Sequence, residues 1–97
     1  IKLPESAVKK EPFAVRKYHI DTNEHVNNCQ YVQMAMDYLP ANYKIYQMRA
    51  EYKQQARLND QICPGKAEAD GVTKILLNDR NNEPYAVVEF MENKNVR

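Results

Sequence analysis

A run of alternating polar residues at positions 21–28 contains the side chains in this sequence that are best suited to chemistry. A carboxylate, a carboxamide and an imidazole stand at every second position, as Asp21, Asn23 and His25. In an extended segment this spacing directs side chains to the same side of the backbone, so the three groups can converge. The residues that follow predict a helix, whose first N–H groups would stabilise an oxygen that becomes negative. The pattern predicts a hydrolytic site that acts on an acyl group.

The same residue types also occur where no chemistry takes place. Asp, Asn and Thr are favoured in turns and at helix N-termini, so Asn27 or Asn28 can be explained as a helix cap. A metal site that uses Asp21 and His25 is a further alternative. The two histidines and two cysteines show no zinc-ligand spacing, so we expect neither a metal nor a cofactor.

The composition predicts one soluble domain, because 97 residues with 43% hydrophobic and 28% charged content are ordinary for a small globular protein. A net charge of +1 with both signs interspersed predicts no nucleic-acid partner, and no apolar run predicts a membrane partner. Cys29 and Cys63 lie far apart and no signal peptide is visible, so a cytoplasmic location is expected. The chain begins at Ile1 without an initiator Met, which is compatible with a fragment or a processed protein.

The elements that must position the motif can be outlined from the residue pattern. Residues 1–12 contain two prolines and a charged run, so we expect a linker there and a single domain over residues 13–97. Residues 13–20 predict a strand that leads into the motif.

The helix expected after the motif has few polar side chains between Cys29 and Leu39. Gln30, Gln33 and Asp37 lie on one narrow stripe, so the helix is expected to be wrapped by other structure and to end at Leu39, before a proline. Cys29 falls in the first turn, where a thiol nucleophile is conceivable, but a buried small core residue is the favoured interpretation.

The second half of the chain reads as a series of antiparallel strands. Residues 43–58 alternate, with Tyr46, Met48, Ala50 and Tyr52 on the face expected to be half-buried. Three further strands are expected, at residues 62–69, 72–77 and 85–91, with turns at residues 70–71 and 78–83. The predicted fold class is α+β, with one helix on one antiparallel sheet.

Residues 21–28 followed by Tyr31, together with the later pair Glu51 and Tyr52, resemble the acyl-acyl-carrier-protein (acyl-ACP) thioesterases. The order of elements is similar to their hotdog fold, in which a long central helix is wrapped by an antiparallel sheet. A polypeptide of this family usually carries two such repeats, with this motif in the C-terminal one. The resemblance covers residues 13–91 and implies that this chain corresponds to the second repeat.

The resemblance also implies which residues act. The catalytic Asp, Asn and His of the family fall on Asp21, Asn23 and His25, and the position of a carboxylate on the following long strand in plant members falls on Gln55. Glutamine cannot act as a base, so this position departs from the family pattern. Glu24 is a second departure, because many relatives have Gly there.

The implied reaction releases a free fatty acid from the acyl carrier protein, as in fatty acid biosynthesis. Water would attack the thioester carbonyl while His25 or Asp21 removes its proton, and Asn23 would position the water or the carbonyl. Two alternatives remain: an acyl-CoA thioesterase of the same fold, and a non-catalytic acyl-binding or structural repeat. The site is expected to need a neighbour, either as a homodimer or with a second hotdog repeat.

Overall fold

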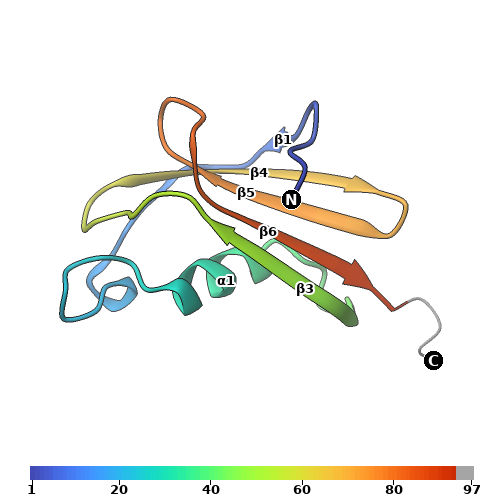
Figure 1. Ribbon diagram of the computed structural model, residues 1–97, viewed down its shortest axis with the longest axis horizontal. Coiled ribbons are helices and arrows are strands. Elements are labelled where there is room, and N and C mark those ends of the chain that lie inside the picture. Colours follow the sequence, from blue (N-terminus) through green and yellow to red (C-terminus); the bar gives the residue numbers. More distant parts are fainter. Residues whose placement is uncertain (94–97) are drawn as a thin grey trace.

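A curved antiparallel sheet covers one short helix in the computed structural model, which describes residues 1–93 (Figure 1). This arrangement confirms the predicted α+β class with one helix on one sheet. The elements in chain order are β1 (Val8–Lys9), β2 (Phe13–Ala14), the 3-10 turn η1 (Lys17–His19), α1 (Asn28–Met36), β3 (Ile45–Tyr52), β4 (Gln61–Ala69), β5 (Val72–Asn78) and β6 (Pro84–Glu92).

The six-stranded sheet has the order β1-β4-β5-β6-β3, and β2 also pairs with β4. The strands β4, β5 and β6 form two successive hairpins, as the turn signals predicted. Asp70 and Gly71 both have positive φ values, 53° and 79°, which suits a tight two-residue hairpin turn. In the other turn, Asp79 Oδ1 accepts the backbone N–H groups of Asn81 and Glu83 at 2.8 and 3.0 Å.

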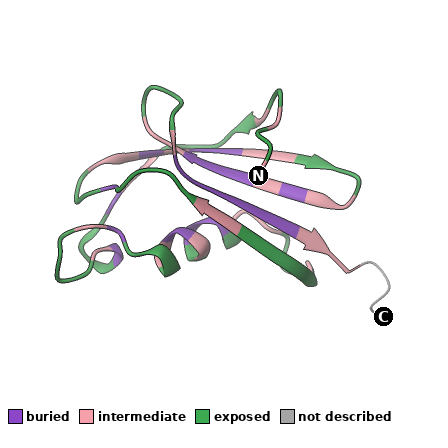
Figure 2. Cartoon of the chain, in the orientation of Figure 1, coloured by how far each residue is buried: buried purple, intermediate pink, exposed green. Residues whose placement is uncertain are grey.

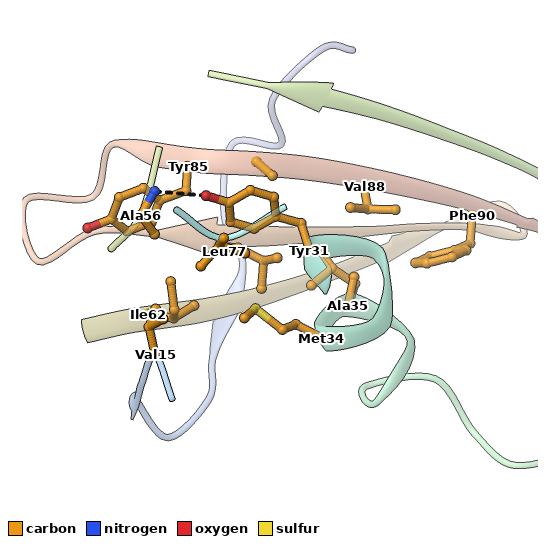
Figure 3. Close-up of a cluster of buried hydrophobic side chains, with 13 residues drawn as sticks. Val15, Tyr31, Met34, Ala35, Ala56, Ile62, Leu77, Tyr85, Val88 and Phe90 are labelled. Carbon is orange, nitrogen blue, oxygen red and sulfur yellow. Dashed lines mark hydrogen bonds between the residues drawn. The ribbon is translucent and has the colours of Figure 1, made fainter. Parts of the chain in front are cut away.

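The hydrophobic core lies between α1 and the inner face of the sheet (Figure 3). Alternation along β5 and β6 turns Ile75, Leu77, Val88 and Phe90 to this side, where all four side chains are fully buried. The helix contributes its buried residues Tyr31, Met34 and Ala35. None of the helices within residues 1–93 has the length and apolar content needed to cross a membrane.

The helix is shorter and less enclosed than expected. It has nine residues, so it is roughly 13 Å long at 1.5 Å per residue, and it ends at Met36 rather than at Leu39. The next N–H groups bond three residues back, which tightens the chain into turns: Tyr38 N–H donates to Ala35 O at 3.1 Å. Only the side that faces the sheet is buried, and Met36 on the other side is 40% exposed (Figure 2).

The strand predicted at residues 13–20 is confined to Phe13–Ala14. The backbone of Val15 bonds to the loop before β4, and Arg16 N–H donates to His19 Nδ1 at 2.9 Å. This second bond turns the chain into η1 and ends the extended conformation. Upstream, Val8–Lys9 inside the expected linker forms β1 and pairs with β4.

The strand predicted at residues 43–58 is also shorter, because β3 ends at Tyr52. Its predicted inner face has the right parity, since Met48 pairs with the buried Phe90 in the neighbouring strand. That face is nevertheless open: Tyr46 is 68% exposed, and Met48 and Tyr52 are each 43% exposed. The reason is position, since β3 is the last strand of the sheet and pairs only with β6 among the described residues (Figure 1).

Candidate active site

The motif segment folds into a closed turn rather than the extended run that the spacing suggested. Ile20 and Val26 form an antiparallel bridge, and between them the N–H of Asp21 donates to His25 O at 3.1 Å. Glu24 N–H donates to Asp21 O at 3.0 Å and completes the turn. Asp21 and His25 are therefore opposite each other, with Asn23 between them at the tip.

Two local features hold this turn. Asp21 Oδ1 accepts the backbone N–H of Asn23 at 2.8 Å, the geometry of an Asx turn. Glu24 has φ 65°, a left-handed conformation that favours glycine. Backbone freedom is therefore needed at position 24, as expected from the glycine of many relatives, although a glutamate occupies it here.

The helix begins directly after the turn and is capped by the motif. Asn27 is the N-cap residue, and its Oδ1 accepts the N–H of Gln30 at 3.1 Å. The capping interpretation of Asn27 is thus confirmed. Within residues 1–93 the backbone N–H groups of Asn28 and Cys29 have no acceptor, so they remain available to an anionic oxygen.

A single cavity of about 410 Å³ collects the predicted residues Asp21, Asn23, His25 and Gln55. The rest of its lining comes from Val26 and from the start of the helix, namely Asn27, Asn28, Cys29 and Gln30. Gln55 reaches it from a loop after β3, not from the strand where the pattern placed it. This loop lies beside the motif because Arg57 and His25 form an antiparallel bridge.

Five lining residues were not among the predicted site residues, and three of them, Asn28, Cys29 and Gln30, begin the helix. The available signal was their position in the first helical turn, directly after the polar motif. For Cys29 the favoured interpretation as a buried core residue was wrong, because its side chain is exposed beside the cavity.

A larger cavity, of about 620 Å³, lies elsewhere and does not include the motif. It lies between the N-terminal residues 2–6 and the outer face of the sheet, where Lys74 and Glu89 line it. Neither an imidazole nor a carboxamide is among its lining residues. In the described part of the chain, no group of three or more His, Cys, Asp and Glu side chains is placed to hold a metal ion.

Comparison with solved structures identifies the architecture. An acyl-ACP thioesterase from Bacteroides thetaiotaomicron has a TM-score of 0.80 at 16% sequence identity, and the match covers 96% of this chain and 42% of that one. A putative oleoyl thioesterase from Lactobacillus plantarum has a TM-score of 0.72 at 22% identity, over 93% of this chain and 38% of the other. This chain therefore spans less than half the length of either protein.

Two further structures are matched over most of their own lengths. YbaW, a probable thioesterase from Escherichia coli, has a TM-score of 0.60 at 17% identity, with 86% of this chain and 78% of YbaW covered. The smu.793 protein from Streptococcus mutans, solved bound to acetyl CoA, has a TM-score of 0.67 at 10% identity, with 97% and 96% covered. At these identities the likeness establishes the fold alone.

Sequence comparison gives the family. A search of curated protein sequences found no match. The family model for the acyl-ACP thioesterase C-terminal domain matches residues 3–92, which is nearly the whole sequence. The chain therefore belongs to the acyl-ACP thioesterase family, as its C-terminal domain.

Proposed function

We propose that this domain hydrolyses the thioester bond of a fatty acyl group carried by acyl carrier protein and releases the free fatty acid. The observation that carries the proposal is the cavity at the start of α1, which Asp21, Asn23, His25 and Gln55 line together. The family match supports this choice of substrate class.

The proposed reaction needs a base and an oxyanion site, and the cavity contains candidates for both. His25 or Asp21 removes a proton from water as the water attacks the acyl carbonyl. The free N–H groups of Asn28 and Cys29 then stabilise the oxyanion, helped by the partial positive charge of the helix N-terminus. Collapse of the tetrahedral intermediate expels the carrier thiol, so one water and one thioester give one fatty acid and one thiol.

Asn23 and Gln55 act as positioning groups in this mechanism. Asn23 holds the water or the carbonyl through its carboxamide, which offers both a donor and an acceptor. Gln55 can do the same, but it cannot take up a proton. No covalent intermediate is needed, and Cys29 is not assigned a role as nucleophile.

The active form pairs with a second hotdog unit, and a homodimer is the form we propose for this chain. The inner face of β3 exposes Met48 and Tyr52, an apolar wall along which an acyl chain can run once a neighbour excludes water. The free edge of the same strand offers backbone groups to a partner strand. The matched acyl-ACP thioesterase chain is more than twice as long, so it has room for a second unit.

An acyl-CoA thioesterase is the second candidate, favoured by the fold shared with a protein solved bound to acetyl CoA. The deciding measurement is thiol release from acyl-ACP and from acyl-CoA with the same acyl chain. We expect a higher kcat/KM on acyl-ACP, and loss of turnover in Asn23→Ala. Asn42→Ala, at an exposed position beyond the other end of α1, is the matched control and should keep full activity.

Two outcomes would contradict the proposal. Faster release from acyl-CoA would reassign the carrier. Binding of acyl-ACP without thiol release would favour the third alternative, a non-catalytic acyl-binding or structural repeat.

A further inference from the structure

A buried hydrogen bond joins α1 to the loop that carries Gln55. Tyr31 Oη accepts the backbone N–H of Ala56 at 2.8 Å, and Figure 3 draws this bond within the core. The tyrosine is 1% exposed and Ala56 is fully buried. Water therefore cannot replace the hydroxyl as the partner of this N–H group without entering the core.

Ala56 is also bonded to the motif. Its carbonyl oxygen accepts the N–H of Val26 at 2.9 Å, and Val26 is itself buried. Both backbone polar groups of Ala56 are thus satisfied by different segments, one by the helix and one by the motif. Of its two neighbours in sequence, Gln55 lines the cavity and Arg57 is bridged to His25 through the backbone.

The start of this loop is bonded to β6 and to the turn before it. Residues 53–55 lie outside the strand ladders, but the N–H groups of Lys53 and Gln54 donate to Tyr85 O at 2.8 and 3.3 Å. Gln54 Nε2 donates to Asp79 Oδ2 and to Glu83 O, each at 3.1 Å, but these bonds are exposed to solvent. These bonds hold the loop only as far as Gln54, whereas Ala56, directly after Gln55, is held by its buried bonds to Tyr31 and Val26. The bond to Tyr31 is therefore one of the constraints on where Gln55 lies.

We propose that Tyr31 is a positioning residue, whose hydroxyl fixes Gln55 against the motif through the backbone of Ala56. Tyr31 does not line the cavity. The expected change in kcat rests on the proposed hydrolysis. The expected change in the position of the loop rests on the hydrogen-bond geometry alone. Burial raises the pKa of the Tyr31 hydroxyl, so the group stays neutral over the pH range of an assay.

Tyr43 provides a matched control elsewhere in the same domain. Its hydroxyl donates to Phe90 O at 3.2 Å and shares a hydrogen bond with the Thr73 hydroxyl at 3.3 Å, and neither partner lines the cavity. Tyr43→Phe therefore removes a hydrogen-bonding hydroxyl with little change in volume, as Tyr31→Phe does. The difference in kcat between the two variants therefore reports the loss of a hydroxyl next to the Gln55 loop, rather than the loss of a tyrosine hydroxyl in general.

The test is a double-mutant cycle in the intact protein that carries this domain, with kcat normalised to the folded fraction. Tyr31→Phe should lower kcat about tenfold or more with KM within about twofold, while Tyr43→Phe lowers only stability. In the Gln55→Ala background, Tyr31→Phe should change kcat by less than about twofold. An unchanged kcat in Tyr31→Phe, or the same loss in both backgrounds, would overturn the proposal.

Absence of turnover on every substrate would contradict the proposed function alone. In that case amide hydrogen exchange still tests the positioning role of Tyr31. The Ala56 and Val26 amides should be protected in the unmodified protein and should lose protection in Tyr31→Phe but not in Tyr43→Phe. If Tyr31→Phe does not fold, the exchange rate of the Ala56 amide in the unmodified protein is the test. Exchange at Ala56 as fast as at the exposed Gln55 would show that the bond does not constrain the loop.

Discussion

The backbone N–H of Asp21 donates to the carbonyl oxygen of His25 at 3.1 Å, so these two residues are held opposite each other by one closed turn. Their side chains enter the same cavity from the two arms of that turn. Loss of the His25 side chain leaves the backbone bonds of the turn intact, whereas loss of the Asp21 side chain also removes the acceptor of the Asn23 N–H. Substitution of His25 therefore tests chemistry more than folding, and an Asp21 variant needs a folding control.

His25→Ala and Asp21→Ala should each lower turnover by about 10²-fold or more, because each removes a member of one acid-base unit. The double variant should lose little more than either single variant. Steady-state thiol release measures all three. Full activity in His25→Ala would exclude the imidazole as base and leave that role to Asp21.

Gln55→Glu should preserve or raise activity, because it restores a carboxylate where plant members of the family have one. The side chain is exposed at the cavity, so the change places no new charge in the core. The same thiol-release assay, with circular dichroism as a folding control, measures the effect. Loss of activity in a folded variant would mean that the N–H donor of the amide, which a carboxylate lacks, is needed at this position.

Glu24→Gly should raise the free energy of unfolding by about 1 kcal/mol, because a left-handed conformation costs an L-residue roughly that amount. Glu24→Val should lower it by about 1 kcal/mol or more, since a β-branched side chain fits this conformation poorly. Asn82→Gly is the control. Asn82 has φ 64°, and asparagine already tolerates that conformation, so the gain should be smaller. Urea denaturation gives the values, and equal gains at both positions would argue against strain at Glu24.

The protein should be a homodimer at micromolar concentration, with the free edge of β3 at the interface. Light scattering measures the mass. Met48→Lys should favour the monomer and reduce activity, because it places a charge on the exposed inner face of β3. Val8→Lys is the control, at a more exposed apolar residue on the opposite edge strand, and should leave the mass unchanged. A stable and active monomer would contradict both the pairing and the interfacial acyl pocket.

Stability should fall as the pH drops below about 6.5, in part because of His19. Burial lowers the pKa of His19, and Arg16 lowers it further, while Asp37 acts in the opposite direction. The unfolded chain therefore binds a proton at this position at a higher pH than the folded chain does. The stability that His19 contributes is fully present above the unfolded pKa and is lost as the pH falls toward the folded pKa.

Urea midpoints at a series of pH values would reveal this dependence. His19→Asn offers an oxygen in place of the Nδ1 acceptor of the Arg16 N–H, and it should show a flatter pH profile. An unchanged profile in this variant would assign the acid sensitivity to other groups.

Much of the fold could be predicted from alternation alone. The last three strands and their turns were located to within one or two residues, because Ile75, Leu77 and Val88 follow the two-residue period of a sheet. The extent of β3 and of the first strand could not be predicted. Their ends depend on tertiary bonds such as Arg16 N–H to His19 Nδ1, which no local pattern encodes.

The candidate site could likewise be predicted only in part. The residue types at Asp21, Asn23 and His25 identified the segment, but not the turn that brings them together. A glutamate at φ 65° is uncommon, so the conformational propensity of Glu24 argued against the observed geometry. The role of Ala56 had no signal at all, because its contribution comes from its backbone.

The exposed edge of β3 has a consequence for handling and for biosynthesis. An unprotected strand rich in tyrosine and aliphatic residues is a template for incorrect pairing, and so for fibrous aggregation, as much as for correct assembly. Its outward face carries Arg49 and Glu51, whose charges act as gatekeepers against a stacked sheet. In the proposed homodimer, each newly made molecule has to meet its proper neighbour before it meets a misaligned copy, which makes protein concentration and the timing of synthesis part of successful folding.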